Sequence, residues 1–300
     1  MITRTEYEGL QGIELRTGNI GLIAVAEFGP RIAFLGRPGG SNLLYWRPGL
    51  HLRGEWDLRG GHRVWTTTPL ADESEYTYRP DNQPCEVQVE ADRFTLLGAE
   101  DPVNRTRRGL TVAIRGETFL EVDNFVVNTG DMLCSGGVWA LTCTVPTPGS
   151  QYVVPVGDGS SWDTFNMVFF RQWAGHGQNS FADSQVEIGH DQVVLRPQGQ
   201  EIKRMLQAHP GIIAMSDTVN DLTFAKQAEF DPAGRYPHAT NIAFYVGPDN
   251  FMVEMETMGV EKTLKPGAEL HHRELWTLQE GAQALNSAAE TKALFASAQT

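Results

Sequence analysis

The sequence predicts an all-β protein built from antiparallel sheets, with a short helix at the C-terminal end. Most of the chain consists of short runs of β-branched and aromatic residues, and Gly, Pro, Asn and Asp separate these runs at close intervals. Helical periodicity is nearly absent. Strands that follow one another so closely, without intervening helices, are expected to pair antiparallel with their neighbours.

The predicted strands extend along most of the chain. Local turn signals join several of them, among them Arg115-Gly116 and His190-Asp191, and favour sequential antiparallel pairing. There are too many strands for a simple sandwich of one Greek key. They are residues 21–27, 31–35, 85–91, 94–97, 110–114, 119–128, 137–145, 152–156, 167–170, 186–188, 192–195, 212–215, 222–229, 241–246, 251–258 and 269–278.

The tail at residues 282–298 is rich in Ala, and its apolar residues Leu285, Ala288, Ala289 and Leu294 have helix-compatible spacing. We predict one terminal helix here, with a packing role. A chain of 300 residues could hold two average domains, but all-β sandwiches of roughly 250 residues commonly form one. Because no linker or internal repeat divides the chain, residues 1–300 are expected to form a single β-sandwich domain.

Charge and composition disfavour several classes of partner. The chain has 24 Lys and Arg against 37 Asp and Glu, a formal net charge of -13, which argues against nucleic acid and acidic membrane surfaces. No apolar run approaches the roughly 20 residues of a membrane span, and the first residues lack the apolar stretch of a signal peptide. Three cysteines without C-x-x-C spacing indicate neither a disulfide framework nor a zinc site. We expect a soluble, cytoplasmic protein.

The most informative stretch is residues 59–65, Arg-Gly-Gly-His-Arg-Val-Trp, followed by residues 78–84, Tyr-Arg-Pro-Asp-Asn-Gln-Pro. It places imidazole, guanidinium, aromatic and carboxylate groups in one neighbourhood, beside a glycine pair that lets backbone approach a ligand closely. Aromatic rings can stack on the C–H face of a sugar while polar side chains bind its hydroxyl groups. The stretch therefore predicts a polar pocket for a sugar.

A late strand at residues 251–258 carries two carboxylates on one face. Because side chains alternate along a strand, Glu254 and Glu256 share a face with Met252 and Met258, about 7 Å apart. In a partly dry pocket, burial and mutual repulsion should raise the pKa of at least one of the two glutamates, which would suit it to act as a base. An exposed strand face would show the same pattern, so the residues alone leave both interpretations open.

Together, these motifs resemble those of the galactose mutarotase-like (aldose 1-epimerase-like) superfamily. The resemblance covers residues 10–278 and rests on residues 60–65, 78–84, 252–259, 264–267 and 274–276, in this order. It implies a large twisted β-supersandwich and mutarotation by acid and base catalysis, with no cofactor and no metal. Mutarotases carry their base in a late strand reading Leu-Glu-Thr or similar. The matching triplet is residues 255–257, so the resemblance implies Glu256 as the base, with Glu254 as the fallback.

Mutarotation also needs an acid, which protonates the ring oxygen while the base takes the proton of the anomeric hydroxyl. A histidine is the natural candidate, because it titrates near neutrality. In the superfamily an early histidine binds substrate, and a mid-chain strand supplies the acid. Here the corresponding strand, residues 138–144, contains no histidine, which departs from the pattern. We expect that His62 or His238 acts as the acid, or that the pocket runs a different reaction.

Further residues are expected to hold the sugar. The guanidinium of Arg59 could bind two hydroxyl groups, a phosphate or a carboxylate in bidentate fashion, although a structural ion pair is the plainer interpretation. Lys203 and Lys226 are additional cations, for which a solvent-reaching position at a strand edge is plainer. Aromatic residues in a β protein are also often core. The predicted substrate-binding set is Arg59, Arg63, Trp65, Tyr78, Asp81, Asn82, Trp139 and His238.

The leading hypothesis is an aldose 1-epimerase-like isomerase that acts on a free, acidic or phosphorylated sugar. One alternative is a lyase-type carbohydrate enzyme that uses the same base to take a carbon-bound proton. The other is a non-catalytic sugar-binding protein on the same fold, since one scaffold can host unrelated functions. The expected ligand is a small carbohydrate, and the protein is expected to be a monomer or a homodimer.

Overall fold

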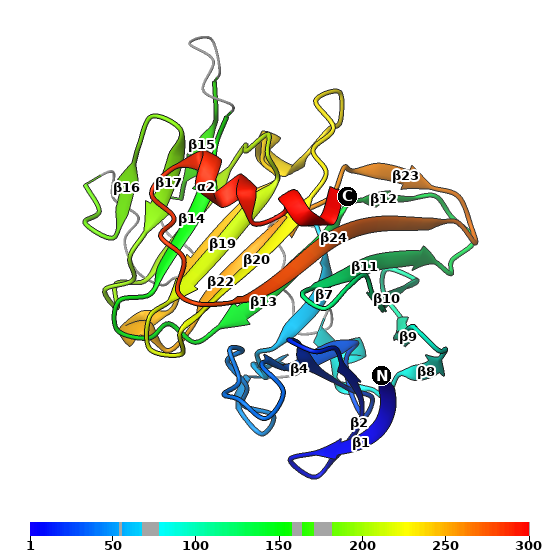
Figure 1. Cartoon of the computed structure of the whole chain (residues 1–300). Helices are drawn as coiled ribbons and strands as arrows, with labels where there is room; N and C mark the ends of the chain where they lie inside the picture. The colour runs from blue at the N-terminus through cyan, green and yellow to red at the C-terminus, as the bar shows by residue number, and fades with distance from the viewer. Residues whose placement is uncertain (54–55, 68–77, 158–163, 171–181, 300) are drawn as a thin grey trace.

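Two ten-stranded antiparallel sheets face each other and enclose the main hydrophobic core (Figure 1). The computed structural model describes residues 1–53, 56–67, 78–157, 164–170 and 182–299. The core contains apolar side chains from both sheets, such as Val64 and Val253 from one and Leu120 and Phe224 from the other. This architecture confirms the predicted all-β fold class.

The first sheet holds the stretch that the sequence singled out. Its strands β7, β13 and β22 lie side by side near the middle, and all its neighbouring strands pair antiparallel. In spatial order the sheet contains β1 (Ile2–Tyr7), β2 (Leu10–Arg16), β3 (Gly21–Val25), β4 (Arg31–Gly36), β7 (His62–Thr66), β13 (Val138–Thr144), β22 (Val253–Met258), β21 (Ile242–Val246), β18 (Ile202–Leu206) and β15 (Met167–Phe169).

The second sheet covers the inner face of the first. In spatial order it contains β16 (Val186–Ile188), β17 (Gln192–Leu195), β14 (Gln151–Pro155), β19 (Ile212–Asp217), β20 (Leu222–Ala228), β24 (Glu269–Glu280), β11 (Phe119–Asn128), β10 (Thr106–Ile114), β9 (Arg93–Asp101) and β8 (Glu86–Val89). Two short ribbons complete the strands, β12 (Cys134–Gly136) with β23 (Lys262–Leu264) and β5 (His51–Arg53) with β6 (Trp56–Asp57).

Every predicted strand has a counterpart, but several strands were not predicted. They include β1 and β2, which form one edge of the first sheet and carry many polar residues, so that their apolar runs are short. They also include β18, whose sequence Ile-Lys-Arg-Met-Leu holds two charges yet is fully buried. A strand with such charges is stable in the interior only because distant residues pair with them, as described below.

The C-terminal helix is shorter than the predicted 282–298. Helix α2 spans only Ala288–Ala293, where the Ser287 side chain accepts a hydrogen bond from the Glu290 backbone and so caps its start. Before this cap, the backbone N–H of Ala282 donates to the Asp221 side chain, just before β20, and that of Gln283 donates to the Thr223 side chain in β20. The short 3-10 helix η4 (Ala296–Gln299) follows α2. Others lie earlier in the chain: η1 (Arg79–Asn82), η2 (Pro237–Ala239) and η3 (Pro248–Asn250).

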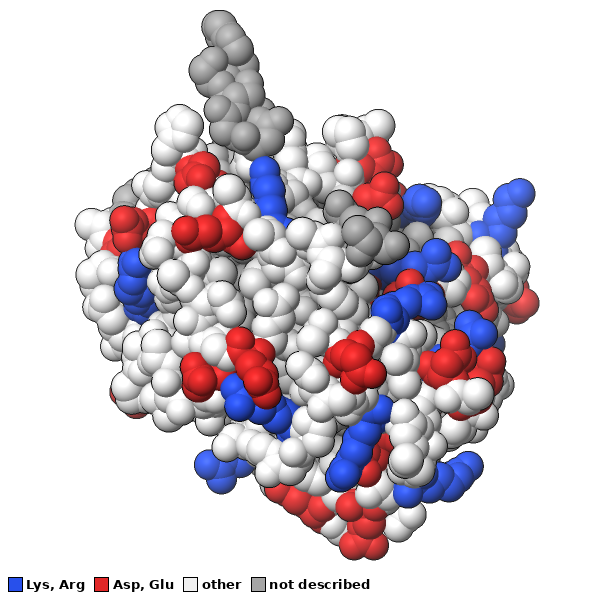
Figure 2. All heavy atoms as spheres, in the orientation of Figure 1, with Lys and Arg blue, Asp and Glu red and all other residues white. Residues whose placement is uncertain are grey.

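The helical tail packs on the outer face of the second sheet, where α2 lies beside β14 and β19 (Figure 1). Leu285, Leu294 and Phe295 are buried there against Phe119 and Ile212. Within the described residues, no helix has the length and apolar character needed to cross a membrane. On the face that Figure 2 shows, basic and acidic side chains lie interspersed rather than in separate areas.

Side chains of β7, β13 and β22 alternate between the inter-sheet core and the outer face of the first sheet. Val253 and Met255 belong to the core between the sheets, whereas Met258 joins an outer-face cluster with Trp65 and Trp139. Glu254 and Glu256 therefore share the outer face, as strand alternation predicts. This face carries the candidate site.

Candidate functional site

Glu256 lies at the centre of the outer face and is fully buried. Both of its carboxylate oxygens are bound. Oε2 accepts a hydrogen bond of 2.8 Å from the indole Nε1 of Trp139 on the neighbouring strand β13. Oε1 contacts the ammonium group of Lys203, which reaches across from β18. A buried carboxylate needs such partners, because burial without them would strongly favour its neutral form.

Glu254 lies two residues earlier on the same face and retains a small contact with solvent, at 8% exposure. Its Oε2 is 4.0 Å from the Lys203 ammonium, and its Oε1 is 3.6 Å from the Cys143 thiol. Burial and then the negative charge of Glu256 raise the pKa of Glu254 to about 7, against the opposing charges of Lys203 and Arg63. A carboxyl group with such a pKa can both accept and donate a proton near neutral pH.

Lys203 was an additional cationic candidate for which a solvent-reaching position was the plainer interpretation, and that interpretation is wrong because the side chain is buried. Its side chain is 1% exposed, and its ammonium lies 5.1 Å from the ring centre of Trp139 and 6.0 Å from that of Tyr245. The aromatic rings and the two glutamates together stabilise the charge. No local signal in the sequence indicates this contact, because Lys203 and Glu256 are far apart in the chain.

A second group of charges gathers around Asp81, which η1 places beside the outer face. The carboxylate of Asp81 is 2.8 Å from an Arg108 guanidinium nitrogen, 3.3 Å from that of Arg31 and 3.8 Å from that of Arg63. Arg31 and Arg108 are nearly fully buried. Asp81 was predicted to bind a sugar hydroxyl. The structure gives it at least a structural role, because it neutralises guanidinium groups that would otherwise be buried without an anion.

Trp65 and Tyr78 pack against each other beside the arginines of this group, with ring centres 4.8 Å apart. The guanidinium of Arg108 lies 4.1 Å from the Trp65 ring centre, and that of Arg63 lies 4.9 Å from it. These contacts leave Trp65 9% and Tyr78 4% exposed. The two aromatic rings therefore pack against the arginine side chains. Only a small part of the surface of each ring remains accessible to a ligand.

Arg59 and Asn82 form a smaller group next to Asp81. Arg59 donates to the Asn82 side chain at 3.2 Å and to Asp57 at 2.7 Å, and its guanidinium lies 3.8 Å above the ring of Phe28. Two residues of the predicted substrate-binding set, Arg59 and Asn82, are thus in direct contact. Burial lowers the pKa of Arg59, and the charges of Asp57 and Asp81 act in the opposite direction.

The glycine pair before His62 has a packing role in this structure. Gly60 and Gly61 have φ values of +77° and +73°, and a Cβ at Gly60 would lie 2.0 Å from the Tyr45 carbonyl oxygen. A Cβ at Gly61 would lie 2.2 Å from the carbonyl oxygen of Ile32. Only glycine fits this left-handed, close approach of backbones. The close approach that the motif predicts is made by neighbouring protein backbone.

His62 does not join the outer-face cluster. Because Arg63 and Trp65 point outward from β7, His62 points inward, where it is fully buried beside the ring of Trp276. Its Nε2 is hydrogen-bonded to Asn124 Oδ1 at 2.8 Å, and its Nδ1 is hydrogen-bonded to the Thr142 hydroxyl at 2.8 Å. Burial lowers its pKa to about 4. The expectation that His62 protonates a sugar bound near Glu256 does not fit this position.

The inward-facing His62 belongs to a buried polar network that the sequence did not predict. Lys226 donates to Thr142 at 3.0 Å and pairs with Glu274 at 2.8 Å, and Asn124 donates to Glu274 at 3.1 Å. Lys226, Thr142, His62, Asn124 and Glu274 thus form a closed ring of hydrogen bonds that links both sheets. Despite burial, Lys226 and the nearby histidines lower the pKa of Glu274 to about 2.

His238 lies in η2 and is exposed, with a positive φ of 50°. Its ring is 6.3 Å from the ring of Phe170, which packs against the outer-face cluster that contains Trp139. His238 therefore lies at the rim of the candidate site and is the remaining predicted histidine on that side.

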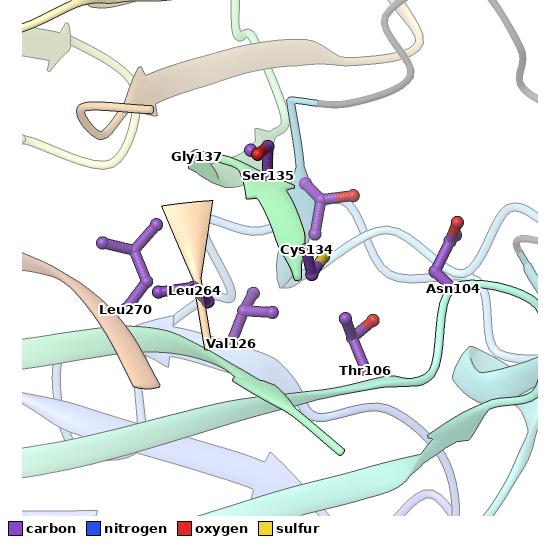
Figure 3. A pocket seen from close by; sticks show the side chains of 10 residues that line it. Asn104, Thr106, Val126, Cys134, Ser135, Gly137, Leu264 and Leu270 are labelled. Carbon is purple, nitrogen blue, oxygen red and sulfur yellow. The ribbon is translucent and has the colours of Figure 1, made fainter. Parts of the chain in front are cut away.

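Two other features lie away from this site. A pocket of about 90 Å³ lies beside β12 and β23 and is lined by Cys134, Val126, Leu264 and others, none of them a predicted site residue (Figure 3). Within the described part of the chain, no cluster of three or more His, Cys, Asp or Glu could hold a metal ion. His271 and His272 lie on opposite faces of β24, since His271 is exposed and His272 buried.

No protein-family model and no curated protein sequence matches this chain. Solved structures do match it. A galactose mutarotase-like protein from Lactobacillus casei is similar over 89% of this chain and 100% of its own, with a TM-score of 0.62 and 11% identity. A galactose mutarotase related enzyme from Lactobacillus acidophilus is similar over 91% of this chain and 98% of its own, with a TM-score of 0.56 and 13% identity.

A TPR-domain containing protein from Parabacteroides distasonis is also similar, with a TM-score of 0.59 and 14% identity. The match covers 92% of this chain and 48% of that protein, so the chain spans about half of that neighbour's length. At such low identities structural similarity establishes the fold alone. The chain has the galactose mutarotase-like β-sandwich fold.

Proposed function

We propose that this protein is a carbohydrate-active isomerase of the aldose 1-epimerase type, in which the pair Glu254 and Glu256 supplies the base for proton transfer on a bound sugar. The observation that carries the proposal is the pair of carboxyl groups on the outer face of β22, held by Lys203 and Trp139. The resemblance of residues 255–257 to the mutarotase triplet points to the same strand, and the fold is similar to that of a galactose mutarotase-like protein.

The chemistry asks for one group that takes the anomeric proton and one that protonates the ring oxygen. The ring then opens, the carbonyl end rotates, and closure gives the other anomer. Resemblance points to Glu256 as the base. The geometry favours Glu254 for direct contact, because both oxygens of Glu256 are already bound, while Glu254 reaches solvent and its pKa is raised to about 7. Either glutamate would act within the same pair.

For the acid, we propose His238, since His62 points into the core. His238 is exposed at the rim and contacts Phe170, which packs beside the glutamate pair's cluster. Arg63, which is partly exposed and near both Asp81 and Glu254, is the group that would bind a sugar hydroxyl, carboxylate or phosphate. The proposed substrates are accordingly free, acidic or phosphorylated sugars.

The proposal is tested by proton NMR of freshly dissolved pure anomers of neutral, uronic and 6-phosphorylated sugars. The protein should accelerate the approach to anomeric equilibrium for at least one class. Glu254→Gln and Glu256→Gln should both remove most of the acceleration, whereas Glu229→Gln, an exposed glutamate after β20, should retain it. Absence of acceleration with every sugar would contradict the proposal.

One observation favours a second candidate, a non-catalytic sugar-binding protein on the same fold. Strand β13 carries no histidine on its outer face, where the superfamily pattern implies an acid, and its outward side chains are Trp139, Leu141 and Cys143. Such a protein would bind a sugar saturably without changing its rate of mutarotation. A lyase-type enzyme would instead form an unsaturated product that absorbs in the ultraviolet.

A further inference from the structure

The two glutamates of the outer face have unequal surroundings. Glu256 is fully buried, and both of its oxygens have a positively polarised partner, the ammonium of Lys203 and the indole N–H of Trp139. Glu254 is farther from the same ammonium, at 4.0 Å, and remains slightly exposed. One lysine therefore faces two carboxyl groups but contacts only one of them directly.

The asymmetry between Glu254 and Glu256 follows from the position of Lys203 in the sheet. It lies on β18, two strands away from β22, and β21 lies between them. Register places Lys203 opposite Tyr245, and Tyr245 opposite Glu254, so the lysine stem crosses β21 diagonally to reach Glu256. Trp139 approaches Glu256 from β13 on the other side. Glu256 is thus fixed from both neighbouring directions.

We propose that Lys203 is a positioning residue that holds Glu256 by direct contact, so that Glu254 is the member of the pair that exchanges protons with the substrate. The assignment deepens the proposed isomerase function and rests on it for the role of the exchanged proton. The charge distribution itself is independent of that function. The contacts with Lys203 and Trp139 occupy both oxygens of Glu256, and Glu254 is the carboxyl group that retains contact with solvent.

The titration of Glu254 follows from all the groups that face it. A negative neighbour disfavours its charged form, and the two cations favour it. Removing the Lys203 charge should therefore raise the pH at which Glu254 titrates, and removing the Glu256 charge should lower it. Within the described residues, the groups that face Glu254 are Glu256 on β22, Lys203 on β18, Arg63 on β7, Cys143 on β13 and Tyr245 on β21.

The experiment is carbon-13 NMR of the full-length protein labelled at the glutamate side-chain carboxyl carbons, titrated without any sugar. In the unsubstituted protein, one carboxyl resonance should titrate near neutrality and should be lost in Glu254→Gln. In Lys203→Met the same resonance should titrate at least about one pH unit higher, because an opposite charge at this distance is typically worth one to three units. Lys262→Met, which removes an exposed lysine of β23, should leave it unchanged.

Persistence of the near-neutral titration in Glu254→Gln would overturn the assignment, and so would an unchanged titration in a folded Lys203→Met protein. If Lys203→Met does not fold, Glu256→Gln decides the question. That variant should keep the titration and move it to lower pH, whereas its disappearance would show that Glu256 is the titrating group. Because no sugar is present, these results stand even if no anomer is interconverted, so the two proposals fail separately.

If a sugar is interconverted, a kinetic readout separates positioning from a merely structural role. The inflection in the pH dependence of kcat/KM should move in Lys203→Met in the same direction and by the same shift as the carboxyl resonance. A variant that lowers activity equally at every pH, with its inflection unmoved, would show that Lys203 supports the fold without setting the protonation of Glu254.

Discussion

His62 and Glu256 lie on opposite faces of the same sheet. The register shows why: Thr142 of β13 pairs with His62 on one side and with Met255 on the other, so His62 shares the inward face with Met255. Glu256, one residue later, points outward. The polar groups near the middle of this sheet therefore divide into an outer cluster around Glu256 and an inner ring around Lys226 and Glu274.

Glu254→Gln should stabilise the protein at alkaline pH. The pKa of Glu254 is raised from 4.5 to about 7 in the folded protein, so folding favours its protonated form, and stability is lost as pH rises through this window. At pH 8 the ionised group costs about 3 kcal/mol, which the uncharged glutamine does not incur. Urea unfolding at pH 8 should show the gain, and at pH 4.5 the two proteins should be nearly equal. A variant less stable than the unsubstituted protein at pH 8 would contradict this.

The buried histidines should make the protein sensitive to acid. Burial lowers the pKa of both His62 and His272 from 6.5 to about 4, so the unfolded chain binds more protons than the folded one between these values. Stability should fall as pH falls from 6.5 to 4, by up to about 3 kcal/mol for each histidine. His62→Gln should flatten part of this dependence in urea unfolding measured at several pH values.

The same variant separates structure from chemistry. His62→Gln should be less stable at pH 7, since it disturbs the hydrogen bonds to Asn124 and Thr142, yet its folded fraction should keep its rate of anomer interconversion. A folded His62→Gln protein without activity would contradict this prediction and would show that His62 takes part in the reaction.

The ion pair of Lys226 and Glu274 should show strong coupling. Both side chains are fully buried, so Lys226→Met alone leaves an uncompensated carboxylate and should cost about 3 to 5 kcal/mol. The double variant Lys226→Met/Glu274→Gln removes both charges and should recover part of this loss. A double-mutant cycle from urea unfolding measures the coupling. Additive losses would show that the two charges act independently.

Trp139→Phe should destabilise the folded protein, because it removes a hydrogen bond to Glu256. The change removes the indole N–H that donates to Oε2 while keeping an aromatic ring, and a hydrogen bond to a buried charge is worth about 1 to 3 kcal/mol. Trp46→Phe is the matched control, because the indole nitrogen of Trp46 is buried with no partner among the described residues. Thermal unfolding should show a larger decrease for Trp139→Phe, and an equal decrease would argue against the hydrogen bond.

The sequence predicts well what depends on local alternation. Every predicted strand has a counterpart in the structure, and strand alternation correctly places Glu254 and Glu256 on one face. The same alternation, applied to residues 62–65, separates His62 from Arg63 and Trp65, which are its neighbours in the motif but not in space. Treating the motif as one cluster overlooked this consequence of the strand.

The groups that depend on distant pairing could not be predicted. The three arginines around Asp81 come from β4, β7 and β10, and only the docking of η1 brings the carboxylate among them. Lys203 finds Glu256 across an intervening strand. Such contacts depend on sheet order, which composition and spacing do not determine. The shortened terminal helix likewise follows from backbone hydrogen bonds to the sheet.

The most direct test of the glutamate pair is the pH dependence of anomer interconversion, measured by proton NMR with the sugar that is turned over fastest. We predict that kcat/KM rises with pH through about 7, where Glu254 loses its proton, and that Glu254→Gln and Glu256→Gln remove most of the activity at every pH. Activity that persists in both folded variants, with the same pH dependence, would contradict the account.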